Sequence, residues 1–221
     1  MCGIVGYVGT NNVPNREYFA LDVVLEGLRR LEYRGYDSAG VAMLEGGKIN
    51  FRKKAGKVAG LDEEIARDPL PDSVVGIGHT RWATHGAPTD ANAHPHVVDG
   101  GKLAVVHNGI IENFAELKTE LAAKGYTFAS ETDTEVAATL LGDIMNGEGN
   151  GNLTESMRLT CNRLEGAFTL LALHVDFPDR IVAARRNSPL VIGLGEGENF
   201  LGSDVSGFID YTKNCLLYTS P

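Results

Sequence analysis

A strand predicted at the extreme amino terminus constrains the fold of this chain more than any other segment. Residues 2–8 (CGIVGYV) form a short apolar run that contains β-branched side chains. Such a run is typical of a strand that is buried on both faces. Cys2 lies at the start of this strand, directly after Met1. Removal of Met1 would leave a thiol and a free α-amine on one residue.

The α-amine of an amino-terminal Cys2 offers a base for its own thiol. A free α-amine has a reference pKa of roughly 7.7–8.0, so a useful fraction is neutral near pH 7. It can accept the thiol proton and activate the nucleophile without a partner histidine. Alternatively, Cys2 is an ordinary small apolar residue at the start of a buried strand, since free cysteine is among the most buried residue types. The position of Cys2 alone leaves both interpretations open.

The composition limits the class of protein. A chain of 221 residues, 43% of them apolar, can bury a large core as one domain. A net charge of −9, with acidic residues spread along the chain, argues against nucleic acid or an anionic membrane surface as a partner. Three unevenly spaced cysteines do not form a disulfide framework and fit a reducing cytosol. Without a long apolar run or the basic segment of a signal peptide, we expect a soluble cytoplasmic protein.

The hydrophobic pattern predicts layers of strands and helices in one domain. A helix with one apolar face precedes Gly35, further helices begin at Asn113 and Thr132, and another covers residues 153–164. Asn113 and Thr132 each have a glutamate three residues later, the arrangement of a capping box. Strands are predicted at residues 2–8, 38–44, 48–53, 74–81, 103–107, 167–173, 180–185, 190–194 and 200–203. Because strands come in sets, and so do helices, the pattern indicates α+β layers rather than regular βαβ alternation.

Residues 79–86 (HTRWATHG) lie where a predicted strand ends and a long loop begins. A structureless loop of that length in a compact domain is usually functional. Arg81 is well placed there to bind a carboxylate, because its planar guanidinium donates two parallel hydrogen bonds. Trp82 beside it would act as a lid. The alternatives are a surface ion pair for Arg81 and a core anchor for Trp82.

Asn108-Gly109 follows the apolar strand that ends at His107. An Asn-Gly pair between apolar runs is the strongest short-range signal for a hairpin. The residues that follow, 110–117 (IIENFAEL), cap and space like a helix instead. We therefore expect a sharp strand-to-helix turn, at which the Asn108 amide and the Gly109 backbone N–H point at a developing oxyanion.

Asp133 lies in the first turn of the helix predicted after Thr132. An acid there stabilises the helix dipole by a few tenths of a kcal/mol, which is a sufficient explanation by itself. Alternatively, Asp133 is a fixed carboxylate that binds a substrate ammonium, and with Arg81 it would hold both ends of a zwitterionic amino acid. Residues 34–38 (RGYDS) have charges that brace this site or simply form a tight turn.

Five of the six histidines lie within residues 79–107, which raises the question of a metal site. Their spacing fits no standard zinc motif, no cysteine is near them in sequence, and the HExxH pattern is absent. The Gly-rich stretches near Gly147 and Gly193 are not in the strand-to-helix context of a phosphate-binding loop. We expect neither a metal ion nor another cofactor.

Six motifs, in this order along the chain, resemble one known family. They are CGIVGYVG at 2–9, LEYRGYDSAG at 31–40, HTRWATHG at 79–86, NAHPH at 92–96, HNGIIEN at 107–113 and SETDTEV at 130–136. Over about residues 1–213 the chain is similar to the class II glutamine amidotransferase family, of the amino-terminal nucleophile hydrolase fold. Members that make phosphoribosylamine or asparagine share Met-Cys-Gly but differ at several other motifs, so the set is most similar to the members that aminate fructose 6-phosphate.

The resemblance implies an α+β fold, a four-layer αββα sandwich of two antiparallel sheets, and a catalytic role for three residues. Cys2, after loss of Met1, would attack the side-chain amide of glutamine and form a γ-glutamyl thioester, with its own amine as general base. Asn108 and Gly109 would stabilise the tetrahedral oxyanion.

The resemblance also implies how glutamine is bound. Arg81 would bind the glutamine carboxylate and Asp133 its α-ammonium. The loop that closes over glutamine would contain Trp82, Thr84 and His85, and Arg34 would support the nucleophile. Closure would direct the released ammonia to an acceptor rather than to water.

In the family, two sugar-isomerase domains follow this domain, bind fructose 6-phosphate and receive the ammonia. They lie beyond Pro221, so we expect a fragment: a glutaminase domain at residues 1–213 that at most hydrolyses glutamine. Residues 214–221 (NCLLYTSP) differ from the expected continuation, and Cys215 is given no function. The resemblance further implies a homodimer for the full-length enzyme and a role in hexosamine biosynthesis.

Three other functions are open on the sequence alone. The first is the glutaminase domain of a phosphoribosylamine-forming amidotransferase. The second is a non-catalytic glutamine-binding module, against which the intact Cys2, Asn108 and Gly109 argue. The third is a metal-dependent hydrolase built on the histidines.

Overall fold

The computed structural model describes residues 2–10, 17–83 and 86–217, in which eleven strands form two sheets. The strands are β1 (Gly3–Gly9), β2 (Ser38–Glu45), β3 (Lys48–Ala55), β4 (Val75–Arg81), β5 (His96–Val98), β6 (Leu103–Ile111), β7 (Gly166–His174), β8 (Val182–Arg186), β9 (Val191–Leu194), β10 (Glu198–Gly202) and β11 (Cys215–Leu217). The larger sheet has the order β11-β9-β10-β1-β4-β2-β3, and the smaller sheet has the order β5-β6-β7-β8. All neighbouring strands are antiparallel.

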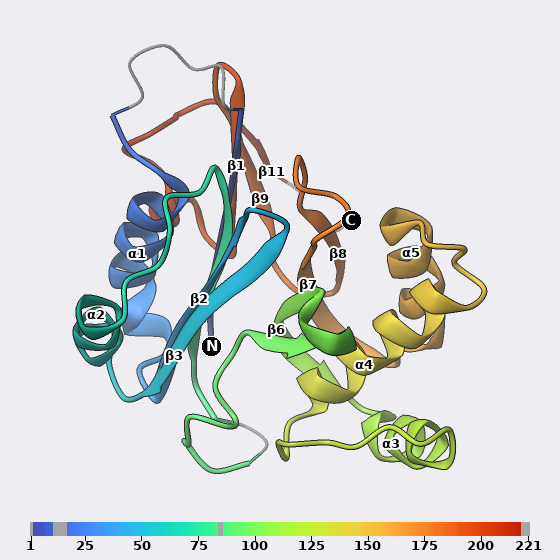
Figure 1. Cartoon of the computed structure of the whole chain (residues 1–221). Helices are drawn as coiled ribbons and strands as arrows, with labels where there is room; N and C mark the ends of the chain where they lie inside the picture. Colours follow the sequence, from blue (N-terminus) through green and yellow to red (C-terminus); the bar gives the residue numbers. More distant parts are fainter. Residues whose placement is uncertain (1, 11–16, 84–85, 218–221) are drawn as a thin grey trace.

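Helices cover the outer faces of both sheets. They are α1 (Ala20–Leu31), α2 (Val58–Arg67), α3 (Phe114–Ala123), α4 (Asp133–Asn146) and α5 (Leu153–Arg163). In Figure 1, α1 and α2 lie outside the larger sheet, and α3, α4 and α5 lie outside the smaller one. This order of layers confirms the αββα sandwich. No helix in the described ranges is long and apolar enough to cross a bilayer.

Three clusters of buried apolar side chains fill the spaces between the four layers. One joins α1 and α2 to the larger sheet, one joins the two sheets, and one joins the smaller sheet to α3, α4 and α5. Ile4 belongs to the cluster between the sheets, whereas Val5 belongs to the cluster under α1. The strand β1 is therefore buried on both faces, as its sequence predicts.

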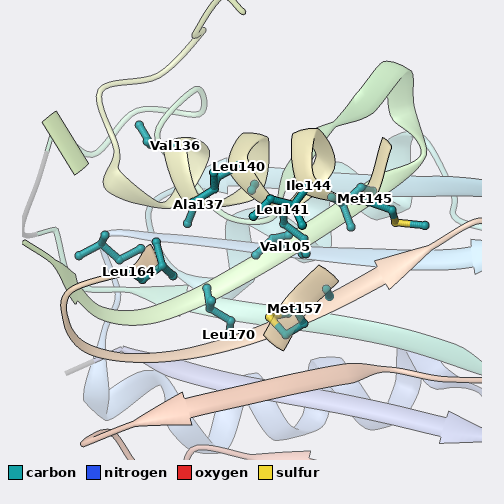
Figure 2. Packing of buried hydrophobic residues seen from close by; sticks show 14 of the residues in the cluster. Val105, Val136, Ala137, Leu140, Leu141, Ile144, Met145, Met157, Leu164 and Leu170 are labelled. Carbon is teal, nitrogen blue, oxygen red and sulfur yellow. The ribbon is translucent and has the colours of Figure 1, made fainter. Parts of the chain in front are cut away.

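The helix α4 is fixed over the smaller sheet by its apolar face. Figure 2 shows Leu141 and Ile144 of α4 above Val105 of β6 and Leu170 of β7. Burial of a side chain of this size contributes about 1.5–3 kcal/mol relative to exposure. This packing fixes the position of Asp133, the first residue of α4, relative to β6.

Two expectations about the segment before α3 are wrong. The strand β6 continues through Asn108 and Gly109 to Ile111, in register with β7, so no strand-to-helix turn occurs at the Asn-Gly pair. Pairing with β7 outweighs the local turn signal. The stretch predicted to be a structureless loop contains β5, in which His96 pairs with Val105.

The capping boxes expected at two helices are not formed as predicted. Asn113 directs its amide to the Arg163 carbonyl and the Glu165 N–H, at 2.9 and 3.1 Å, and makes no side-chain cap for α3. Thr132 does cap α4, since its hydroxyl accepts the Glu135 N–H at 3.3 Å. The Glu135 carboxylate accepts N–H groups of residues 129 and 130 instead of that of Thr132.

The end of the described chain adds a short edge strand. The strand β11 pairs with β9 through Cys215 and Gly193, within the segment expected to be anomalous. Residues 218–221 lie outside the described ranges. The boundary predicted at residue 213 stays a prediction.

Candidate active site

The register between β1 and β4 brings Cys2 to the end of β4. Gly3 pairs with Thr80, so the residue that precedes β1 lies beside the residues that follow Thr80. The approach is close, because a Cβ at Gly3 would lie 2.6 Å from Thr80 Oγ1 and 2.8 Å from Leu31 Cβ. A larger residue would displace the Thr80 side chain and Leu31 of α1. The glycine of the Cys-Gly pair thus allows β1 to pack closely against Thr80 and α1 beside the thiol.

The Cys2 thiol contacts the backbone of Trp82. The Trp82 N–H donates to Sγ at 3.2 Å, and Sγ lies 3.6 Å from the Trp82 carbonyl oxygen. Burial raises the pKa of the Cys2 thiol, while the Trp82 N–H and Arg81 act in the opposite direction. Over the described ranges, no side chain is hydrogen-bonded to Sγ. The α-amine of Cys2 itself is therefore the candidate base.

Asn108 connects the smaller sheet to Cys2. Its Nδ2 donates to the Cys2 carbonyl oxygen at 3.0 Å, and its Oδ1 lies 3.0 Å from His79 Nε2. In Figure 1, the start of β1 accordingly lies beside β6. An amide nitrogen carries two hydrogens. One is used by the Cys2 carbonyl, and the second is available to an oxyanion formed at the thiol.

Gly109 lines two cavities that Cys2 also borders. Its φ of +118° is in the region that favours glycine. A Cβ at this position would lie 2.0 Å from the Ala167 carbonyl oxygen. Only glycine is therefore compatible with this backbone beside the thiol.

We expect Gly109→Ala to reduce the stability of the fold. The left-handed backbone alone costs on the order of 1–3 kcal/mol for alanine, and the clash with the Ala167 carbonyl adds to that cost. Gly125→Ala is the matched control, because Gly125 has a φ of +95° and a Cβ there would meet nothing within 4 Å. Urea unfolding should show a clearly larger loss for Gly109→Ala. Equal losses for both variants would mean that the close approach to Ala167 has no energetic consequence.

Arg81 is the last residue of β4, and its side chain is buried. It is 4% exposed, which excludes the surface ion pair considered for it. Its guanidinium donates to the carbonyl oxygens of Gly86 and Ala87 at 3.2 and 3.3 Å. These contacts tie the end of β4 to the chain that follows residue 85.

Asp133 reaches the same region from the layer of helices. It is 4% exposed, and its Oδ2 accepts the Ile111 N–H at 2.9 Å. The hydrogen bond from Ile111 fixes the position of the Asp133 carboxylate. Any stabilisation of the helix dipole by its charge is a separate effect. Arg81, Asp133 and Cys2 together line one small polar cavity. The structure thus brings the three residues together from β4, α4 and the start of β1.

Trp82 presents its side chain to the surface. It is 46% exposed, which excludes a core anchor, and its ring packs edge-on against Tyr36 with centroids 5.4 Å apart. Thr84 and His85, expected in the same loop, lie outside the described residues. The role of Trp82 as a lid stays a prediction.

The segment RGYDS at 34–38 braces the end of β4. The carboxylate of Asp37 accepts the Ala83 N–H at 2.8 Å. Arg34 pairs with Asp204 at 3.3 Å and lines, with Cys2, a cavity of about 330 Å³. The other lining residues are Trp82, Asn108, Gly109, Ile110, Ala167, Asn187, Ser188 and Pro189. The thiol therefore borders this cavity as well as the one that Arg81 and Asp133 line.

Four of the clustered histidines are buried at the site, and two of them, His94 and His107, line the cavity of Arg81 and Asp133. Burial lowers the pKa of His79 to about 3 and holds the pKa values of His94 and His96 well below the usual range. His107 Nδ1 lies 2.9 Å from Thr134 Oγ1. Within residues 2–10, 17–83 and 86–217, no group of three or more His, Cys, Asp or Glu side chains is arranged to hold a metal ion.

Sequence reasoning assigned no role to the motif NAHPH at 92–96. In the structure, Asn92 Nδ2 donates to the Ala87 carbonyl at 3.0 Å, and Asn92 Oδ1 accepts the Glu131 N–H at 2.9 Å. The Ala87 carbonyl also binds Arg81, and Glu131 is two residues before Asp133. Asn92 therefore connects the carbonyl that binds Arg81 to the segment that precedes Asp133. The motif NAHPH can be read from the sequence, but its role cannot, because Asn92 contacts residues as distant in the chain as Glu131.

Comparisons with known proteins give consistent matches. A family model described as a glutamine amidotransferase domain matches residues 79–209. A glutamine–fructose-6-phosphate aminotransferase (isomerizing) of Corynebacterium diphtheriae is 77% identical over 98% of this chain and 35% of that protein. The protein of the same name from Streptomyces coelicolor is 60% identical over 98% of this chain and 34% of its own length. The chain thus spans about a third of the length of these curated relatives.

One solved structure extends the comparison to the fold. A glutamine phosphoribosylpyrophosphate amidotransferase of B. subtilis matches with a TM-score of 0.77 at 25% identity. The match covers 94% of this chain and 43% of that one.

Proposed function

The chain belongs to the glutamine amidotransferase domain family, and we propose that it hydrolyses the side-chain amide of glutamine through a thioester on Cys2. One observation carries the proposal. The Cys2 thiol borders a cavity together with Arg81 and Asp133, while the Asn108 amide donates to the backbone of the same cysteine. A nucleophile, an oxyanion donor and two opposite charges for a zwitterion are thus joined in one site.

The first half of the proposed reaction forms the thioester. After removal of Met1, the α-amine of Cys2 takes the thiol proton, and Sγ attacks the amide carbon of glutamine. The tetrahedral oxyanion accepts hydrogen bonds from Asn108 Nδ2 and the Gly109 backbone N–H. The Cys2 ammonium then returns its proton to the leaving nitrogen, the C–N bond breaks, and ammonia departs.

The second half of the proposed reaction restores the enzyme. The α-amine of Cys2 takes a proton from water, and the resulting hydroxide attacks the thioester carbon. The C–S bond breaks, glutamate is released, and the thiolate regains its proton. Arg81 and Asp133 hold the carboxylate and the α-ammonium of the substrate through both halves, which fixes the reacting carbon beside Sγ.

We extend the proposal to the protein of which this domain is a part. High identity to aminotransferases named for glutamine and fructose 6-phosphate supports fructose 6-phosphate as the ammonia acceptor. Binding of that sugar, and assembly as a homodimer, would involve regions beyond these residues. Three free cysteines, including the proposed nucleophile, favour a cytoplasmic location. An amidophosphoribosyltransferase is the weaker candidate, since its solved relative is only 25% identical.

Release of glutamate and of ammonia from glutamine tests the proposal. The chain without Met1 should form both products in equal amounts, and EDTA should not change the rate. Glutamine binding without product release would indicate the non-catalytic module. Activity lost to EDTA would indicate a metal-dependent hydrolase instead.

We expect Arg81→Ala to weaken glutamine binding. The loss of a charge-assisted pair with the carboxylate should raise KM by roughly 10- to 100-fold. Because Arg81 also holds two loop carbonyls, the effect is separated with 4-aminobutanamide, which is glutamine without its carboxylate. The KM of the wild type and of Arg81→Ala for this analogue should be similar. Arg158→Ala, at an exposed arginine on α5, is the control. An unchanged KM for glutamine in Arg81→Ala would remove its role in binding.

A further inference from the structure

His79 is a buried residue that the reaction proposed above does not use. It lies on β4, opposite Ile4 of β1 and Gly40 of β2, and it is 0% exposed. Its Nε2 lies 3.0 Å from Asn108 Oδ1. Its ring packs against that of His94, with centroids 4.1 Å apart. The imidazole is therefore held in one place directly behind the proposed oxyanion donor.

The two contacts of the Asn108 amide define which way it points. The Cys2 carbonyl oxygen can only accept a hydrogen bond, so the amide nitrogen faces Cys2. The amide oxygen consequently faces His79, and Nε2 of His79 must carry the hydrogen of that bond. Over the described ranges, no second donor to Asn108 Oδ1 is present. The Cys2 carbonyl oxygen therefore fixes the amide through its nitrogen, and one imidazole N–H fixes it through its oxygen.

His79 is unsuited to move protons itself. It is neutral over the whole range in which enzymes of this kind work, since burial lowers its pKa to about 3. It also makes no hydrogen bond to Cys2 Sγ, whose partners in the described chain are both in the Trp82 backbone. A neutral imidazole can nevertheless donate one hydrogen bond at all these pH values.

We propose that His79 is a positioning residue for the oxyanion site: its Nε2–H holds Asn108 Oδ1, so that the Asn108 N–H groups face Cys2 and the reacting carbon. This inference rests on the glutaminase activity proposed above. Without the bond, the amide can turn by half a rotation about its Cβ–Cγ bond. An oxygen would then face the developing negative charge. The motif NAHPH at 92–96 contributes through His94, whose ring supports that of His79.

The proposal predicts a specific kinetic signature. Oxyanion stabilisation is stronger in the transition state than in the ground state, so its loss lowers kcat and leaves KM nearly unchanged. Complete loss of one oxyanion donor lowers kcat by about 10²- to 10³-fold in a well-studied protease. Asn108 is still present in a variant of His79, so the loss should be smaller than that on complete removal of the donor. If the amide is turned away in most of the molecules, the expected loss is roughly 10- to 100-fold.

Two amide variants of His79 separate positioning from packing. The side-chain nitrogen of glutamine lies near the position of Nε2, whereas that of asparagine lies near the position of Nδ1. We expect His79→Asn to lose kcat by roughly 10- to 100-fold and His79→Gln to regain most of that loss, with KM changed by less than about threefold in both. The control is His174→Asn, because His174 is buried at the far end of β7 and faces Leu103 rather than Asn108. Its kcat should equal that of the wild type.

Three outcomes would overturn this inference. They are equal losses of kcat in the two His79 variants, an effect on KM instead of kcat, and a similar loss in His174→Asn. If the wild type does not hydrolyse glutamine, the proposed function fails. The hydrogen bond from His79 to Asn108 can still be tested on the wild type by a measurement that needs no activity. Nitrogen-15 NMR of the His79 ring, assigned through its backbone, should show hydrogen on Nε2 at neutral pH. Hydrogen on Nδ1 would contradict the proposed hydrogen bond, whether or not any variant folds.

Discussion

Cys2→Ala is expected to abolish the release of glutamate from glutamine while glutamine binding survives. Without the sulfur no thioester forms. The remaining groups can bind glutamine, but only direct attack by water could then cleave its amide. The expected loss in kcat is about 10⁴-fold or more, the scale found when a catalytic nucleophile is removed. Binding should remain because Arg81 and Asp133 are untouched, and isothermal titration of the variant with glutamine would measure it.

The control for this variant is Cys161→Ala. The Cys161 thiol is also partly buried, and burial raises its pKa too, but it lies on α5 and packs against the cluster under the helices. Its substitution should leave kcat unchanged. Substantial turnover in Cys2→Ala, or equal losses in the two variants, would mean that another group performs the attack.

An extension before Cys2 is expected to have the next largest effect on the rate. A peptide bond at the Cys2 nitrogen removes its basicity, and no described side chain is hydrogen-bonded to Sγ to replace it. Loss of a general base lowers rates by about 10²- to 10⁴-fold. Burial raises the thiol pKa, so little thiolate would form unaided. The residual rate of the extended chain should therefore increase with pH, as the thiolate fraction grows.

The added residues can be made removable, so that their effect is tested in both directions. If the extension ends in a protease site directly before Cys2, cleavage should restore the rate of the mature chain in the same sample. A chain of equal length with the extension at its carboxyl terminus controls for the added residues. Full activity before cleavage would show that the α-amine is not the base.

Local sequence patterns correctly predict those elements whose determining interactions lie within a few residues of each other. The apolar run at 2–8 became β1 because its two neighbours and both flanking layers bury it. Thr132 caps the start of α4 because its hydroxyl accepts the N–H three residues later. Both predictions needed only short-range periodicity or capping, which physical chemistry determines within a single turn or strand.

Predictions from local sequence patterns are wrong where an interaction with a residue distant in the chain determines the structure. Asn108-Gly109 has the local signal of a turn, yet β6 continues because Asn108 pairs with Thr169 of β7. Asn113 resembles a helix cap, yet its amide binds backbone groups at the end of α5. In both cases the competing interaction involves residues about fifty or more positions away, which no local pattern contains.

The candidate site shows the same division. The residue types at Cys2, Arg81 and Asp133 indicate their chemistry from the sequence alone. Their common cavity follows from strand register and from the packing of α4, which are properties of the whole sandwich. The contact between His79 and Asn108 crosses from one sheet to the other, so neither motif reveals it alone.

The most direct test of the central claim is the mass of the covalent intermediate. Samples quenched with acid during glutamine turnover should contain a chain that lacks Met1 and carries one glutamyl group as a thioester. Fragmentation should locate that group on the first residue, Cys2, and hydroxylamine should remove it. A glutamyl group on a chain that retains Met1, or on any other residue, in a preparation with full activity would contradict the account.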